Sequence, residues 1–246
     1  MKYLGFIAFN SWKIYVGCIF TITLIVFYPV FLVLLNNEKW KPIAFNLCVF
    51  WSRCVRIFSF YGVVQINSFA ISDTPKVIIA NHTSYLDIFL LYSILPSNKF
   101  IFLGKSEILT YPLLKTFFKK LNIPVYRKNR VKAARSFMAC KKAIENGWSV
   151  VIFPEGGIPD DNLPQLIPFK EGAFKLAKSC NAPILALTYI NNYRLFSDPE
   201  AIYGSAFPGL AKVHFHPLIS EEEINKNTVE DIKEKAFQLI SSVLKK

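Results

Sequence analysis

The residues Asn81-His82-Thr83-Ser84-Tyr85-Leu86-Asp87 mark the passage from a predicted strand into a predicted helix. The apolar run Lys76–Ala80 before them is typical of a buried strand, and Ile88–Tyr92 after them is typical of a helix. A histidine at the carboxyl end of a strand lies where open α/β sheets usually bind their ligands. These residues therefore predict an α/β domain with a candidate site directly after this strand.

His82 and Asp87 are the two side chains of this stretch that suit proton transfer. If Ser84 caps the helix, Asp87 falls in its first turn and the loop can bring the His82 ring to the carboxylate. A neutral imidazole can take a proton from a hydroxyl, while a carboxylate on its other nitrogen fixes the tautomer. However, Ser84-x-x-Asp87 is also an ordinary capping box, and a single histidine at a strand end is often only polar surface. The seven residues alone leave both interpretations open.

The chain from residue 62 onward alternates short β-rich runs with helical patterns, which predicts a mixed open sheet flanked by helices. The predicted strands are Val63–Ile66, Val77–Ala80, Phe100–Leu103, Pro124–Tyr126, Val150–Phe153, Ile184–Thr188 and Lys212–His216. The predicted helices are Asp87–Leu95, Pro112–Leu121, Val131–Asn146, Glu171–Ser179 and Val229–Leu244. We assign residues 62–246 to this α/β domain.

Residues 1–61 predict a helical segment that anchors the chain in a membrane. Ile14–Leu35 holds 22 residues without a charge; as a helix it would extend roughly 33 Å, which is enough for a hydrocarbon core. A cleaved signal peptide is disfavoured because Leu34–Lys39 offers no small-residue cleavage site. Hydropathy does not separate a helix that spans the bilayer from one that enters a single leaflet.

The second part of this segment, Pro42–Tyr61, is aromatic and apolar, and it carries Arg53 and Arg56 on one helical face. A basic amphipathic helix favours a membrane interface, with Trp40 and Trp51 at the level of the headgroups. The alternative is a helix that packs on the core of the α/β domain. We expect the interfacial position.

The composition indicates an anionic partner of a lipid kind. Lys and Arg number 29 against 17 Asp and Glu, so the formal net charge is +12. Nucleic acid would suit this charge, but 23 Phe and a 52% hydrophobic content favour anionic lipid and phosphorylated substrates. The cysteines are odd in number and lack a C-x-x-C pair, which favours reduced thiols in a cytoplasm-facing protein over disulfides or a zinc site. They are Cys18, Cys48, Cys54, Cys140 and Cys180.

Cations and glycines follow two further predicted strands. Gly104 permits close backbone approach, and Lys105 and Arg127 can hold a phosphate, although Lys128 and Arg130 compete for the second position. A single Lys or Arg is more often a solvated surface charge.

A buried strand then runs into Pro154-Glu155-Gly156-Gly157, whose glycines can let an acceptor approach the main chain. The alternative here is a plain glycine turn with a solvated Glu155. A fourth apolar stretch, Ala182–Leu187, is either a wall of a substrate pocket or simply a core strand.

These four stretches, in order between residues 76 and 190, resemble the blocks of the glycerolipid acyltransferases, the family of 1-acylglycerol-3-phosphate (lysophosphatidate) acyltransferases. The resemblance implies a membrane-bound enzyme with His82 as general base and Asp87 as its orienting partner. It implies that Gly104, Lys105, Arg127, Glu155, Gly156 and Gly157 position the acceptor.

The acceptor is then a lysophospholipid and the product phosphatidate, with acyl-CoA or acyl carrier protein as acyl donor and neither metal nor cofactor. The active site would face the cytoplasm, at the inner membrane in a bacterium.

One departure from the family pattern keeps another acceptor open. The family continues Phe-Pro-Glu-Gly-Thr-Arg, whereas Gly157 and Ile158 stand here in place of Thr and Arg. An O-acyltransferase of a lyso-aminolipid of the ornithine or glycine type is therefore an alternative.

A serine lipid hydrolase is disfavoured because the chain has no Gly-x-Ser-x-Gly elbow. A non-catalytic lipid-binding membrane protein is the remaining alternative. His214 and His216 share a face of a predicted strand, but two histidines without further ligands do not make a metal site.

Overall fold

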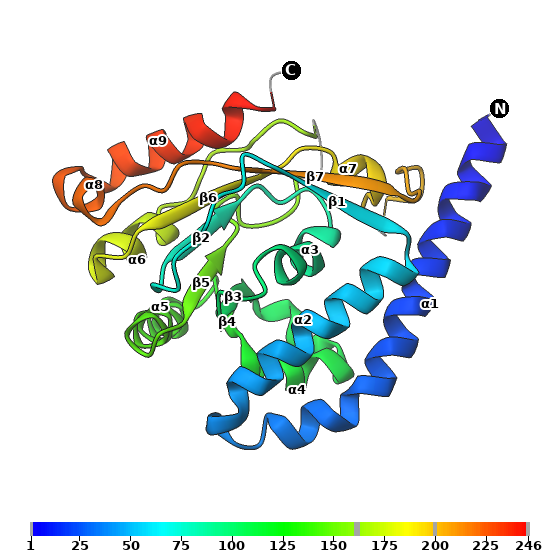
Figure 1. The fold of residues 1–246 in the computed structure, drawn as a ribbon, viewed down its shortest axis with the longest axis horizontal. Coiled ribbons are helices and arrows are strands. Elements are labelled where there is room, and N and C mark those ends of the chain that lie inside the picture. The colour runs from blue at the N-terminus through cyan, green and yellow to red at the C-terminus, as the bar shows by residue number, and fades with distance from the viewer. Residues whose placement is uncertain (1, 160–162, 199–200, 245–246) are drawn as a thin grey trace.

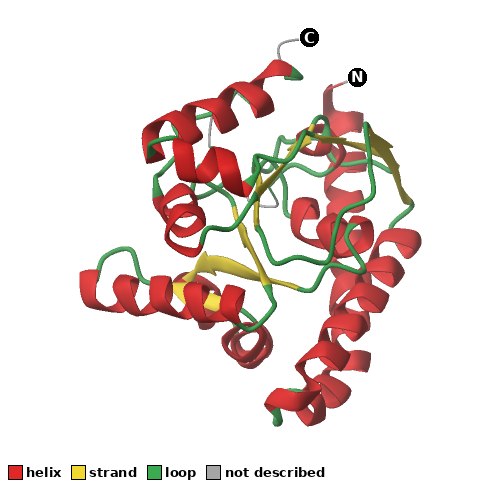
Figure 2. Cartoon of the chain, turned by 60° about the vertical axis from the view of Figure 1, so that its left-hand side comes forward, coloured by secondary structure: helices red, strands yellow, loops and turns green. Residues whose placement is uncertain are grey.

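A seven-stranded sheet lies between two layers of helices in the computed structural model, which describes residues 2–159, 163–198 and 201–244 (Figures 1 and 2). Its strands are β1 (Tyr61–Ile66), β2 (Val77–Ala80), β3 (Phe100–Lys105), β4 (Ile123–Val125), β5 (Ser149–Ile152), β6 (Ile184–Tyr189) and β7 (Gly209–Phe215). Its α-helices are α1 (Lys2–Leu34), α2 (Lys41–Phe58), α3 (Leu86–Ile94), α4 (Pro112–Leu121), α5 (Arg130–Glu145), α6 (Gly172–Cys180), α7 (Asn192–Leu195), α8 (Glu221–Lys226) and α9 (Val229–Ser242). Two 3₁₀ helices are η1 (Glu38–Trp40) and η2 (Ser106–Thr110).

The sheet is mixed and open, as predicted. Its strand order is β1-β7-β6-β2-β5-β3-β4, and every neighbouring pair is parallel except β6 and β7. Each of the seven predicted strands overlaps an observed one, with bounds that differ most for β7. The five predicted helices of the α/β domain are also present, as α3, α4, α5, α6 and α9.

The central strand β2 is buried on both faces, which explains its continuous apolar run. Side chains alternate across a strand. Val77 and Ile79 therefore face the layer that contains α6 and α9, whereas Ile78 and Ala80 face the layer of α2 and α3. All four residues are buried. A helical layer on each face is the usual environment of parallel strands.

The connections after β2 and β5 leave the sheet on opposite faces. The chain passes from β2 through α3 to β3 on one side, and from β5 through α6 to β6 on the other. These two crossovers diverge at the carboxyl ends of the two central strands, which is a topological switch point and the place where such sheets bind ligands. His82 and Glu155 follow these two strands.

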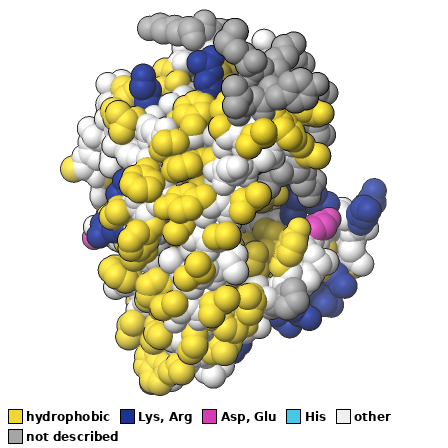
Figure 3. Space-filling model, turned by 90° about the vertical axis from the view of Figure 1, so that its right-hand side faces the viewer, with side chains coloured by type: hydrophobic (Ala, Val, Ile, Leu, Met, Phe, Trp, Pro, Cys, Tyr) yellow, Lys and Arg dark blue, Asp and Glu magenta, His cyan; other side chains and the backbone are white. Residues whose placement is uncertain are grey.

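The helix α1 exposes a long apolar surface. Among the described residues, Gly5–Leu34 is the one helical segment whose length and apolar composition would suffice to cross a membrane. Only 17% of the most apolar stretch of this helix is buried against the rest of the chain. Hydrophobic side chains cover the face on which α1 lies (Figure 3). The exposed apolar residues of α1 include Ile7, Ile14, Ile22, Ile25, Val26, Val30, Leu32 and Val33.

The expected position of Trp51 at the headgroups is wrong, because one face of α2 packs on protein. Phe45, Trp51 and Val55 are buried in the same core as α3. The Trp51 ring packs edge-on against Phe89, and its Nε1 donates to Thr23 Oγ1 at 2.9 Å, so it does not reach a headgroup layer. Aromatic bulk on this face is therefore used for packing between helices. The division into residues 1–61 and 62–246 stays a prediction.

Candidate active site

The His82 ring meets the Asp87 carboxylate, as the sequence predicts. His82 lies in the loop after β2, Asp87 lies in the first turn of α3, and Nδ1 is 3.0 Å from Oδ2. The Asp87 side chain is fully buried, whereas 14% of the His82 side chain is exposed. The imidazole is therefore the member of the pair that solvent or a ligand can reach.

Asp87 accepts hydrogen bonds through both of its oxygens. Its Oδ2 also accepts from the backbone N–H groups of Thr83 at 2.7 Å and Ser84 at 2.9 Å. Its Oδ1 accepts from Asn192 Nδ2 at 2.6 Å. The expected capping box is wrong, because α3 begins after Tyr85 without a side-chain cap and the backbone N–H of Asp87 donates to Ser84 O. The Asp87 carboxylate instead binds the loop that carries His82 and contacts the imidazole.

The position of the His82 ring determines which nitrogen is available. The ring stacks on Phe153, with centroids 4.0 Å apart and planes at 14°. In the described part of the chain, Nδ1 takes the Asp87 contact and no residue hydrogen-bonds Nε2. With a proton on Nδ1, Nε2 has a free lone pair that can accept a proton from a hydroxyl.

Glu155 joins the two loops of the site. Its Oε1 accepts from the backbone N–H of His82 at 2.8 Å, and its Oε2 accepts from the N–H of Ile167 at 3.3 Å. The side chain is buried, so the alternative of a plain turn with a solvated Glu155 is wrong. Burial raises the pKa of Glu155 to about 7, and the nearby Asp87 charge contributes to this rise. The two backbone hydrogen bonds act in the opposite direction and lower the pKa. Glu155 thus holds the loop after β5 against the loop after β2.

Three cations surround the turn that follows Glu155. A Cβ on Gly156 would lie 2.7 Å from Lys170 Nζ and 3.2 Å from Arg127 Nη2, and a Cβ on Gly157 would lie 2.8 Å from Lys105 Nζ. We call Lys105, Arg127 and Lys170 the cation cluster. The two predicted cations therefore meet at the predicted glycine turn, together with one that we did not predict.

Other predicted residues have packing roles. A Cβ on Gly104 would lie 2.6 Å from Phe118 Cζ, so this glycine makes room for α4. The stretch Ala182–Leu187 is buried and runs into β6, which begins at Ile184, and this matches the interpretation as a core strand.

Sequence reasoning missed Asn192 and Lys170. Asn192 comes shortly after β6, whose carboxyl end lies beside that of β2, so a polar residue after a neighbouring parallel strand was the available signal. Lys170 gave no such signal, because it precedes a helix rather than follows a strand.

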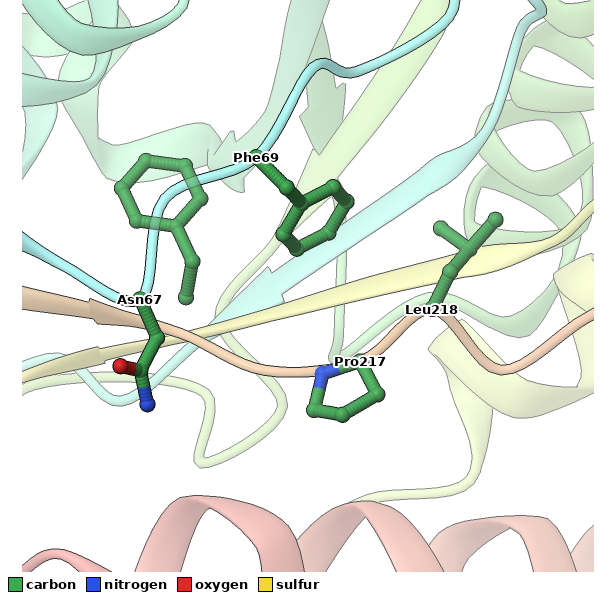
Figure 4. A pocket seen from close by; sticks show the side chains of 5 residues that line it. Asn67, Phe69, Pro217 and Leu218 are labelled. Carbon is green, nitrogen blue, oxygen red and sulfur yellow. The ribbon is translucent and has the colours of Figure 1, made fainter.

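The two remaining histidines lie elsewhere. His214 Nε2 pairs with Asn67 Nδ2 at 2.9 Å, and His216 Nε2 pairs with Thr188 Oγ1 at 2.7 Å. Near them a hollow of about 310 Å³ is bordered by the segments that follow β1 and β7 (Figure 4). It is lined by Asn67, Phe69, Phe215, Pro217 and Leu218. None of the predicted site residues lines it, so it is separate from the His82 site.

A family profile described as Acyltransferase matches residues 63–190, which hold His82, Asp87, the glycine turn and the cation cluster. The chain belongs to the acyltransferase family. The resemblance seen in the sequence is thus confirmed at the level of the family.

Several curated acyltransferases are similar to this chain. A chloroplastic 1-acyl-sn-glycerol-3-phosphate acyltransferase of Brassica napus is 29% identical over 76% of this chain and 53% of its own length. A 1-acyl-sn-glycerol-3-phosphate acyltransferase of Saccharomyces cerevisiae is 30% identical over 71% of this chain and 57% of its own. The chain thus spans about half the length of these relatives.

A solved acyltransferase shares the fold over its whole length. The crystal structure of a 1-acyl-sn-glycerophosphate (LPA) acyltransferase from Thermotoga maritima superposes with a TM-score of 0.80 and covers 100% of this chain and 97% of that one. The two sequences are 18% identical, so this likeness concerns the fold.

Proposed function

We propose that this acyltransferase moves a fatty acyl group from an acyl thioester to the free hydroxyl of 1-acylglycerol 3-phosphate, forming phosphatidate. The observation that carries the proposal is the pair of His82 and Asp87, with Nε2 unoccupied among the described residues. The cation cluster beside it supports an acceptor that bears a phosphate. The names of the relatives support the same reaction.

In this mechanism His82 acts as general base. Nε2 takes the proton of the acceptor hydroxyl as its oxygen attacks the thioester carbonyl, and the Asp87 carboxylate stabilises the imidazolium that forms. The carbon–sulfur bond then breaks, the thiolate leaves, and it receives the proton held by His82. Lys105 and Arg127 hold the phosphate, while Glu155 keeps the two loops together. Either coenzyme A or acyl carrier protein can supply the thioester.

We further propose that α1 holds the enzyme at a membrane with the active site on the cytoplasmic side. The long row of exposed apolar residues on α1 would cost free energy in water and is stabilised in contact with lipid. An acceptor with one acyl chain resides in such a bilayer.

Thiol release from acyl-coenzyme A and from acylated carrier protein tests the function. The purified chain in mixed micelles is assayed with lysophosphatidate and with a phosphate-free lyso-aminolipid. We expect release that requires lysophosphatidate. His82→Ala should lower kcat by roughly 10²–10⁴-fold, the usual contribution of a positioned general base.

His214→Ala is the matched control, because it removes a histidine that lies outside the site. Its kcat should stay close to that of the unmodified chain. A His82→Ala variant that keeps kcat within a few-fold contradicts the mechanism. Release with the aminolipid alone would instead support the alternative acceptor, and no release from folded protein would support a lipid-binding role.

A further inference from the structure

The cation cluster assembles from three segments that are distant in the sequence. Lys105 ends β3, Arg127 follows β4, and Lys170 precedes α6. The backbone N–H of Lys170 donates to Pro154 O at 2.9 Å, which ties this residue to the turn before Gly156. All three cationic groups therefore reach the same two glycines from fixed points of the fold.

The exposed carboxylate of Glu107 interacts electrostatically with Arg127 and Lys105, but it forms no ion pair with either of them. Within residues 2–159, 163–198 and 201–244, no salt bridge involves Lys105, Arg127 or Lys170. Partial burial, together with the charges of Arg127 and Lys105, lowers the pKa of Lys170. Three cations that approach one another without an ion pair are stabilised when an anion binds between them.

The two glycines let the cationic side chains lie directly against the backbone. Gly156 has φ +88°, a conformation that glycine adopts without strain, and the place where a Cβ would lie is taken by Lys170 at Gly156 and by Lys105 at Gly157. Glu155, which precedes this turn, is bonded to the backbone of His82. An anion held at the glycines therefore lies beside the loop that carries the general base.

We infer that Lys170 binds the phosphate of the acceptor as the third cation of this site, and that it replaces the cation missing at Ile158. A phosphomonoester suits three cations because it carries nearly two charges and three free oxygens. A phosphodiester headgroup has one charge and fewer free oxygens, and an aminolipid has no phosphate. Lys170 thus favours lysophosphatidate over both. This inference rests on the proposed function, since the phosphate belongs to that acceptor.

Kinetics of Lys170→Met with lysophosphatidate test the inference. We expect KM to rise roughly 10- to 100-fold, as for the loss of a charge-assisted hydrogen bond, with kcat within a few-fold. Lys170→Arg should recover most of the affinity because it keeps the charge. Lys175→Met is the matched control: it removes one lysine charge from the helix that follows Lys170, but Lys175 is paired with Glu171. Its KM should not change.

Two results would overturn the inference: a KM for Lys170→Met within two-fold of the unmodified chain, or an equal rise with a phosphate-free acceptor. Calorimetric titration with glycerol 3-phosphate separates the inference from the proposed function. If the unmodified chain fails to acylate lysophosphatidate, the function is wrong. Binding of glycerol 3-phosphate that Lys170→Met weakens would still support the site, and binding that it leaves unchanged would refute it.

Discussion

Replacing Asp87 with asparagine removes the charge of the orienting residue while keeping the size of its side chain. Asp87 accepts four hydrogen bonds, three of them through Oδ2. The Oδ1 of Asn192 is buried without a hydrogen-bond partner among the described residues, so the Asn192 amide can turn over. It would then accept from the new amide at position 87. Asp87→Asn can therefore keep all four contacts.

The expected loss of kcat follows from the charge alone. An imidazolium charge about 4 Å from the carboxylate is stabilised by roughly 4 kcal/mol at an effective dielectric constant of about 20. That stabilisation corresponds to about 10³-fold in rate. The change in the free energy of unfolding should be smaller, about 2 kcal/mol or less. The weaker hydrogen bonds of a neutral acceptor are offset because a buried carboxylate no longer has to be desolvated.

The assay is thiol release from the acyl thioester with saturating lysophosphatidate, paired with denaturant unfolding in the same micelles. The double variant Asp87→Asn with Asn192→Asp is the matched control. It restores the charge to the buried pair but places it at position 192, whose contact is with residue 87 rather than with the imidazole. We expect it to have near-normal stability and a kcat that stays about 10³-fold low.

A kcat for Asp87→Asn within three-fold of the unmodified chain would contradict the role of Asp87, because no imidazolium would then form in the limiting step. Recovery of kcat in the double variant would also refute it. The charge would then act through the general field of the site and not through the contact with His82.

Two further predictions concern Glu155 and the glycine turn. The pKa of Glu155 is raised from 4.5 to about 7, so the folded chain binds a proton that the unfolded chain has released. This group therefore lowers the free energy of unfolding by roughly 3 kcal/mol as pH rises from 4.5 to 7. Denaturant unfolding across that range should show Glu155→Gln lacking this decline; an unchanged pH profile would contradict the burial argument. Gly156→Ala should lower the free energy of unfolding by about 1–3 kcal/mol, because alanine is strained at this positive φ. It should also lower kcat/KM, because the new Cβ forces Lys170 to move. Gly147 also has a positive φ, but a Cβ there would contact no other atom. Gly147→Ala should therefore lower the free energy of unfolding without changing kcat/KM, which denaturant unfolding and kinetics of both variants will check.

Local sequence patterns predict the elements and the contact between His82 and Asp87. Apolar runs such as Val77–Ala80 predict strands because burial on both faces requires continuous apolarity, and this property is local. His82 and Asp87 are five residues apart at the start of one helix, so the same short-range geometry brings their side chains together. The glycine turn after β5 is local in the same sense.

The distant residues that surround this pair follow from the arrangement of the strands in space. Asn192 reaches Asp87 because β6 lies beside β2, and Lys170 reaches Gly156 because its backbone is bonded to Pro154. The same holds for α2, whose aromatic face could have met either lipid or protein until the positions of α3 and α1 were known. The pattern of apolar and polar residues along a chain indicates which side chains will be buried and which will be exposed. The contacts of these side chains depend on the strand order and the crossovers, which are set by packing energies summed over the whole domain.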